Sequence, residues 1–193
     1  MIGPEEVGIM SKVCIAVGFA AVILAPQTVS AATTVFGGGM AEACSKAAIR
    51  GEVEVQYEKI CTESLQTEFL DPRDRAGTFV NRGVLRLRRA RYEEATQDFN
   101  DAVRLAPDLG EAYVNRGAAA VGRHQFAQAL TDINRSIELG VDEPAKAYFN
   151  RAMAYEGLGN VKAAYFDYQK ALEIKPDWDA PKTELTRFSV SQR

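Results

Sequence analysis

Asparagine and arginine recur in this sequence at a spacing that could support recognition chemistry. The string FVNRG at residues 79–83 returns as YVNRG at 113–117 and as YFNRA at 148–152. An asparagine side chain carries both a donor and an acceptor, so one residue can bond a peptide group at both ends. An arginine packed beside a helix needs a partner for its charge. These residue types indicate hydrogen-bonded recognition.

An aspartate follows each of these arginines sixteen residues later. A constant offset of this kind indicates a structural role, and an ion pair would neutralise each guanidinium within its own segment or a neighbouring one. The predicted pairs are Arg82 with Asp98, Arg116 with Asp132, and Arg151 with Asp167.

Catalytic groups are scarce. The single histidine, His124, lies in a stretch that reads as a turn, and no cluster of ligand residues has metal-binding spacing. The glycines of FGGGM at 36–40 lack the strand and lysine of a phosphate-binding loop, so we interpret them as a linker. We expect no enzyme activity, no cofactor and no metal.

Charge argues against a polyanionic partner, since the chain has a net charge of −3 and 25% charged residues. Nucleic acid is therefore not an expected partner. Residues 73–91 nevertheless hold seven arginines. They could meet an acidic partner or anionic lipid, or form a solvated face balanced by nearby acids; we favour the second.

The first thirty-two residues have the pattern of a signal peptide. Lys12 precedes an uncharged apolar run, and small residues follow it up to Ala31 and Ala32, either of which could be the cleavage point. A membrane anchor would need roughly 20 apolar residues, and Pro26 ends this run earlier. We expect export, to the periplasm in a Gram-negative host, without stable membrane insertion afterwards. Translation could begin at Met10, and residues 33–40 read as a linker.

The asparagines reveal a repeat, because 34 residues separate Asn81 from Asn115 and 35 separate Asn115 from Asn150. Periods of this length indicate a solenoid in which each unit buries its apolar face against the next. Within a unit the apolar residues have helical spacing, and breakers at 88–91, 122–125 and 157–160 divide it in two. Each unit is predicted to be a helical hairpin.

At this level the sequence resembles the tetratricopeptide repeat family. The resemblance implies an all-α, right-handed α-solenoid with repeats at 76–109, 110–144 and 145–178, a degenerate first hairpin at 41–75 and a capping helix and tail at 179–193. The residues that match the family pattern are Phe79, Gly83, Tyr92, Ala95, Phe99, Ala102, Pro107, Tyr113, Gly117, Phe126, Ala129, Tyr148, Ala152, Gly159, Ala164, Tyr168, Ala171 and Pro176.

Two cysteines remain after the predicted signal. Aligned with the repeat, Cys44 and Cys61 occupy facing places between the two helices of the degenerate hairpin. In an oxidising compartment this pairing favours a disulfide. The alternative is two buried thiols that pack as small apolar groups.

The resemblance also implies a concave groove, lined by the first helix of each hairpin, that holds a peptide or a partner's helix. Three asparagines at successive repeats would form a ladder that reads backbone, with amides at least partly exposed in the free protein. Alternatively, each asparagine bonds a neighbouring helix and only shapes the array. The predicted groove residues are Val80, Asn81, Val84, Arg88, Val114, Asn115, Ala118, Phe149, Asn150 and Met153.

The predicted function is a non-enzymatic module that binds a protein or peptide. The alternative is a structural scaffold of the cell envelope that self-associates through its ends or outer faces.

Overall fold

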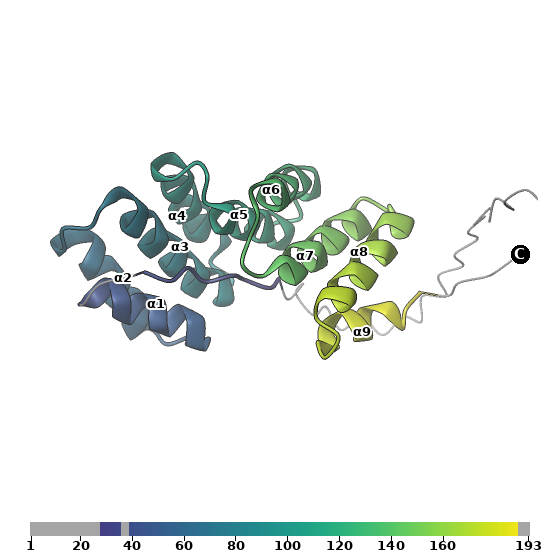
Figure 1. Ribbon diagram of the computed structural model, residues 1–193, viewed down its shortest axis with the longest axis horizontal. Helices are drawn as coiled ribbons and strands as arrows, with labels where there is room; N and C mark the ends of the chain where they lie inside the picture. Colours follow the sequence, from purple (N-terminus) through teal and green to yellow (C-terminus); the bar gives the residue numbers. More distant parts are fainter. Residues whose placement is uncertain (1–27, 36–38, 189–193) are drawn as a thin grey trace, which may run out of the picture.

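The computed structural model describes residues 28–35 and 39–188, and within these ranges the chain forms nine helices and no strand. The helices pack as successive hairpins along one axis, which gives the elongated shape in Figure 1. The prediction of an all-α solenoid is confirmed. Most of the predicted signal peptide lies outside the described residues. Among the residues described, no helix is long and apolar enough to span a membrane.

Four hairpins and one closing helix make up the array. They are α1 (Met40–Arg50) with α2 (Val55–Thr67), α3 (Pro72–Arg88) with α4 (Tyr92–Leu105), α5 (Gly110–Gly122) with α6 (Phe126–Leu139), α7 (Pro144–Gly157) with α8 (Val161–Ile174), and α9 (Asp179–Leu185).

Local sequence sets the helix boundaries. Helix α3 begins where the Asp71 carboxylate accepts the N–H groups of Arg73 and Asp74, with Pro72 in the first turn. Since Pro72 already belongs to α3, the second repeat begins before residue 76. The turns inside three hairpins each contain a left-handed residue, namely Ala90, His124 and Gly159, with φ of 56°, 58° and 75°. His124 therefore lies in a turn between two helices.

The core lies between the hairpin layers and is built from small residues beside large ones. A Cβ added to Gly83 would lie 2.4 Å from the Phe99 ring, so only glycine lets α3 approach α4 this closely. At the far end, Phe149 packs against Tyr168 and Trp178, with ring centroids 5.4 and 5.0 Å apart. Helix α9 covers this aromatic cluster, and its N-cap residue is Trp178.

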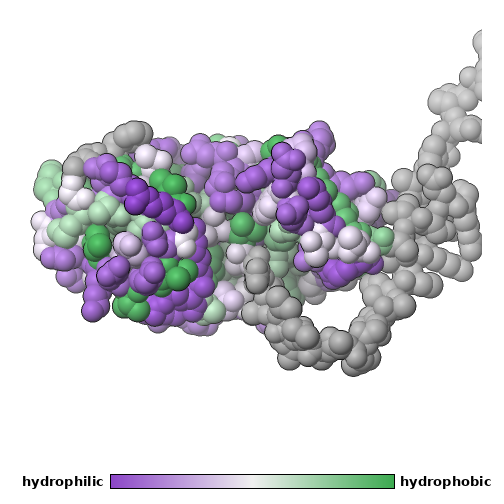
Figure 2. Space-filling view, turned by 90° about the horizontal axis from the view of Figure 1, so that it is seen from below, coloured by the Kyte–Doolittle hydropathy of each residue, from purple (hydrophilic) through white to green (hydrophobic). Residues whose placement is uncertain are grey.

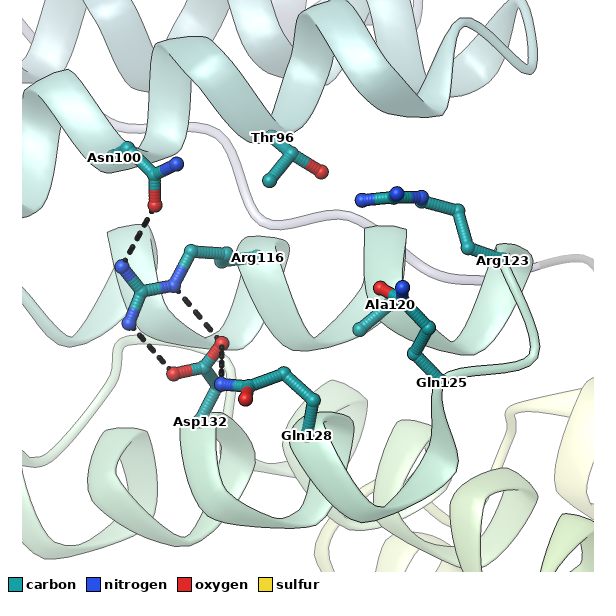
Figure 3. Close-up of a pocket in the computed structure, with 8 residues that line it drawn as sticks. All are labelled: Thr96, Asn100, Arg116, Ala120, Arg123, Gln125, Gln128 and Asp132. Atoms are coloured by element: carbon teal, nitrogen blue, oxygen red, sulfur yellow. Dashed lines mark hydrogen bonds and ion pairs between the residues drawn. The ribbon is translucent and has the colours of Figure 1, made fainter.

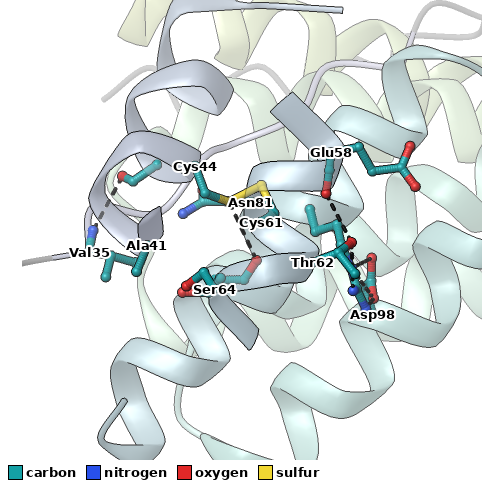
Figure 4. The surroundings of a disulfide bond; sticks show 12 residues. Val35, Ala41, Cys44, Glu58, Cys61, Thr62, Ser64, Asn81 and Asp98 are labelled. Atoms are coloured by element: carbon teal, nitrogen blue, oxygen red, sulfur yellow. Dashed lines mark hydrogen bonds and ion pairs between the residues drawn. A yellow bond between two sulfur atoms is a disulfide. The ribbon is translucent and has the colours of Figure 1, made fainter. Parts of the chain in front are cut away.

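A disulfide joins the two helices of the first hairpin. Cys44 of α1 and Cys61 of α2 have Cα atoms 4.9 Å apart, and both residues are fully buried (Figure 4). Closing a loop of 17 residues restricts the unfolded chain by about 3 kcal/mol. The bond therefore fastens the first hairpin of the described array.

The surface is neither uniformly polar nor uniformly apolar. Figure 2 shows hydrophobic and hydrophilic residues interspersed over the face seen from below. Among the described residues, large apolar side chains are exposed mainly in the first hairpin and the segment after it: Ile49, Val53, Val55 and Phe69.

Candidate functional site

An extended segment of the chain lies along the first helices of three repeats. We call residues 28–35 the strap; they precede α1 and form no helix or strand. In Figure 1 the strap is the purple trace that runs from beside α7 toward α1 and α2. Val29 packs with the aromatic cluster, Ala31 with the core of α5 and α6, and Ala32 with the core of α3 and α4.

The repeated asparagines hold the strap through its backbone. Asn81 accepts the N–H of Thr33 at 2.9 Å and donates to the Thr33 carbonyl at 2.7 Å. Asn115 does the same with Ala31, at 2.9 and 2.6 Å. Asn150 does so with Val29, at 3.1 and 2.8 Å. Each asparagine thus bonds both the N–H and the carbonyl of one strap residue, and the bonded residues alternate along the strap.

We call these three residues the asparagine ladder. The strap runs opposite to the order of the repeats, because its earliest residue meets the latest asparagine. Successive asparagines bond residues two apart, which lie about 6.6 Å apart in an extended chain. In an extended chain alternate peptide groups point the same way, so the ladder contacts one edge of the strap.

Other residues complete the hold on the strap. Lys146 of α7 donates to the Ser30 carbonyl at 2.9 Å, and Ser45 of α1 donates to the Thr33 carbonyl at 2.9 Å. The Ser45 hydroxyl also accepts the N–H of Val35 at 3.3 Å. Gly77 allows close contact here, since a Cβ on it would meet the side chains of Val35 and Thr33 at 3.0 and 3.2 Å.

The predicted exposure of the three amides is wrong. Asn81, Asn115 and Asn150 are all completely buried. The alternative, bonding to a neighbouring helix, does not occur either, because the long-range partners of these amides lie in the strap. Among the residues that the structure describes, Asn115 alone has a further bond, to the Glu111 carbonyl of its own helix. We predicted exposure because a bonded amide has nothing to offer a ligand. The cover here is itself an extended peptide segment.

The predicted apolar groove residues lie mostly in the core. Val80, Val84 and Ala118 are fully buried in the cluster that includes Cys44 and Ala48 of α1. Val114 and Phe149 are buried as well, and Met153 is partly buried between two clusters. Helix periodicity places these residues on one face as predicted, but α1, the strap and the neighbouring helices cover that face.

Arg88 contacts α1 instead of the strap. Its guanidinium donates to the Ala48 carbonyl at 2.7 Å, near the C-terminal end of α1. Burial lowers the pKa of Arg88 from its ordinary value. This arginine therefore supports the helix end and does not belong to the ladder.

The three Arg–Asp pairs that the sixteen-residue offset predicts all form, and each joins the two helices of one hairpin. The closest N–O distances are 2.7 Å for Arg82–Asp98, Arg116–Asp132 and Arg151–Asp167. The second amino group of each arginine reaches back to the preceding hairpin. The acceptors there are Thr62, Asn100 and Asn134, at 3.1, 2.9 and 2.9 Å.

Figure 3 shows this arrangement for Arg116, with Asp132 on one side and Asn100 on the other. The hydrogen bond to Asp132 raises the pKa of Arg116, and that to Asp167 raises the pKa of Arg151. Burial raises the pKa of Asp98, although Arg82 and Arg86 both bond it. Each arginine thus links three helices.

Acidic residues of the same chain form ion pairs with arginines of the stretch 73–91. Glu58 of α2 contacts three of these arginines, Arg86, Arg89 and Arg91, at 2.6 to 3.1 Å. Arg73 pairs with Asp108 at 2.9 Å. These ion pairs fit a balanced face, in which Glu58 and Asp108 supply negative charge from outside the stretch.

No pattern in the sequence predicts the strap or two of its contacts, Ser45 and Lys146. Residues 28–32 read as part of a signal peptide and 33–40 as a linker, yet residues 29–35 are bonded to the array. The asparagine contacts span 48 to 121 residues along the chain, so no local pattern signals them. Within the residues described, no group of histidine, cysteine or acidic side chains could hold a metal ion.

Comparison with known proteins fits this geometry. Residues 145–177 match the family model described as tetratricopeptide repeat. The fold is that of a tetratricopeptide repeat array. Among solved structures, the tetratricopeptide repeat domain of Arabidopsis OM64 has a TM-score of 0.57 and 24% identity, over 60% of this chain and 95% of that one. No curated protein sequence matches the chain.

Two further solved structures share the tetratricopeptide repeat fold. MamA from Desulfovibrio magneticus RS-1 has a TM-score of 0.60 and 20% identity, over 77% of this chain and 82% of that one. The second such domain of human RPAP3, solved with an HSP70 peptide, has a TM-score of 0.55 and 23% identity, over 60% and 96%. At these identities the similarity concerns the fold.

Proposed function

We propose that this protein is an interaction module whose asparagine ladder binds an extended protein segment through its backbone. The observation that carries the proposal is the strap itself, a stretch of peptide bonded at both ends of every second residue. The RPAP3 domain, of the same fold, was solved with a bound peptide. Its example supports a peptide as the ligand here.

The ladder favours a class of ligand and not a particular sequence. It contacts N–H and carbonyl groups, which all non-proline residues share. Each neutral hydrogen bond contributes about 0.5–1.5 kcal/mol net, so three double contacts are enough for measurable affinity. Ser30 and Ala31 are buried, so the ligand needs small side chains at these two places.

The disulfide supports an oxidising location for this module. Such bonds persist outside the cytoplasm and are rare within it. Together with the signal-like N-terminus, Cys44–Cys61 supports an exported, periplasmic protein. Export is checked by recovering the processed chain, with its disulfide intact, from the periplasmic fraction.

A synthetic octapeptide with the strap sequence, Thr-Val-Ser-Ala-Ala-Thr-Thr-Val, tests the function. The receptor is the full chain carrying Val29→Pro, Ala31→Pro and Thr33→Pro, because proline lacks the N–H that the ladder accepts. We expect the labelled peptide to bind this variant at least tenfold more tightly than the wild-type chain, whose strap competes.

N-methylated peptides provide the matched control. A methyl on the nitrogen of the residue equivalent to Ala31 removes a ladder bond, whereas one on its neighbour, equivalent to Ala32, does not. The first should weaken binding and the second should not. Equal effects would contradict backbone recognition. If the proline variant does not fold, the same odd–even difference must appear with millimolar peptide on the wild-type chain.

A further inference from the structure

The strap divides into two parts that different residues hold. Asn150, Asn115 and Lys146 hold Val29 to Ala31. Asn81 and Ser45 hold Thr33 to Val35. The predicted cleavage points, after Ala31 or Ala32, fall between the two parts.

We infer that the uncut strap occupies the ladder as a ligand in cis, and that cleavage after Ala31 or Ala32 opens a subsite formed by Asn115, Asn150 and Lys146. The ligand of this subsite is an extended segment with an apolar residue followed by two small residues. The inference rests on the proposed function of the ladder, to which it adds when the site is open and what it accepts.

The uncut chain favours its own strap because the two are covalently joined. A tethered segment acts at an effective concentration on the order of millimolar, so a separate peptide at lower concentration competes poorly. After cleavage, residues up to Ala31 become a separate molecule that can dilute away. Thr33 and Val35 remain attached to α1 and stay at Asn81 and Ser45.

Release leaves polar groups that need a partner. Within the described residues, both hydrogen bonds of the Asn150 amide go to Val29, so release breaks both. Asn115 keeps its bond to Glu111 alone. An amide in a confined place without partners is costly, so water or a new peptide must replace the strap. Lys146 remains beside Glu143 and can again donate to a carbonyl.

The shape around the strap sets the ligand class. Ala31 is 3% exposed and lies in the cluster with Val114, Val121 and Ala147, where a larger side chain would overpack the core. Ser30 is 6% exposed. Val29 adjoins the cluster of Phe149 and Tyr168, which favours an apolar side chain.

The test compares the exported, processed chain with the uncut full chain in its oxidised form. Side-chain amide signals of the three asparagines are assigned by NMR in both. We expect the signals of Asn115 and Asn150 to change on processing, and that of Asn81 to change least because Thr33 stays attached to the array. N-terminal sequencing of the exported chain must begin at Ala32 or Thr33.

The probe is the acetylated peptide Thr-Val-Ser-Ala, added to each form. It should shift the Asn115 and Asn150 signals of the processed chain and bind the uncut chain at least tenfold more weakly. The control peptide Thr-Val-Ser-Trp should not bind, because its last side chain does not fit. A start outside residues 32–33, unchanged asparagine signals, or equal binding to both forms would overturn the inference. The octapeptide would still bind the proline variant if only this inference failed.

Discussion

Each residue of the repeated string has a separate physical task. The aromatic residue lies under the guanidinium three places later, at 5.5, 5.3 and 5.1 Å from ring centroid to Cζ for Phe79, Tyr113 and Tyr148. The next residue fills the core, and asparagine bonds the strap. Arginine joins three helices, and the final small residue lets two helices meet. Recurrence of the string therefore reflects both helix packing and the hydrogen bonds to the strap.

Removing one member of an Arg–Asp pair should be more damaging than removing both. The Asp132 side chain is only 3% exposed, so Arg116→Leu leaves a charge buried without its main partner. We expect a loss of about 3 kcal/mol in the free energy of unfolding. Adding Asp132→Leu should restore much of it, as urea unfolding would measure.

The exposed pair Arg104–Asp101 is the control, where Arg104→Leu should cost below about 1 kcal/mol. A double variant less stable than Arg116→Leu would contradict this account of the pair.

Thr33 offers a second test at this scale. Its hydroxyl oxygen is buried and has no hydrogen-bond partner among the described residues. Thr33→Val replaces it with a methyl group and should stabilise the bound strap by about 1 kcal/mol. Amide exchange at Ala31 should slow about fivefold in consequence. Thr34→Val, at an exposed position, should change nothing, and faster exchange in the Thr33 variant would count against the bound strap.

At the scale of elements, the hairpin turns require one residue in the left-handed conformation, and that residue is not always glycine. Ala90 has φ of 56° where Gly159 has 75° in the equivalent turn. An L side chain there costs roughly 1–2 kcal/mol, partly offset by the greater flexibility of glycine in the unfolded chain. We expect Ala90→Gly to stabilise the protein by about 0.5 kcal/mol and Gly159→Ala to destabilise it. Melting temperatures of the two variants that shift in the same direction would contradict a stability effect of the left-handed conformation at these positions.

Helix α1 depends on a distant carboxylate. Its N-cap, Gly39, has no side chain to offer, and Glu68 accepts the N–H groups of Met40 and Ala41 at 2.7 and 2.8 Å. A hydrogen bond from Ser64, together with these N–H groups, lowers the pKa of Glu68 from its ordinary value. A lowered carboxyl pKa stabilises the folded state above the unfolded pKa, about 4.3, and this contribution is lost as pH falls through the folded value.

Glu68→Gln should therefore lower the melting temperature at pH 7, and its difference from wild type should shrink below about pH 4. Glu63→Gln, at an exposed position of α2, is the matched control. A difference that does not depend on pH would contradict the role of the carboxylate charge.

At the scale of the whole molecule, the strap ties together repeats that otherwise contact only their neighbours. It crosses α3, α5 and α7 and contributes to all three core clusters. The free energy that holds it is thus spread over the array, and displacement by a ligand would be felt in several repeats.

The sequence allowed the repeats to be predicted because each hairpin is local and its spacing is constant. The Arg–Asp partners followed from the same regularity, with one offset of sixteen residues in all three pairs. The strap lacks any such signal: its small and β-branched residues read equally well as the exit of a signal peptide. Only the folded array brings Val29 next to Asn150.

The most direct test of the account is residue-by-residue amide exchange of the uncut chain, followed by NMR. The N–H groups of Val29, Ala31, Thr33 and Val35 are bonded, whereas those of Ser30, Ala32 and Thr34 have no acceptor among the described residues. We predict alternation along the strap, with the first set exchanging at least tenfold more slowly than the second. Uniformly fast exchange across residues 29–35, or slow exchange at the even positions, would contradict a backbone held by the asparagine ladder.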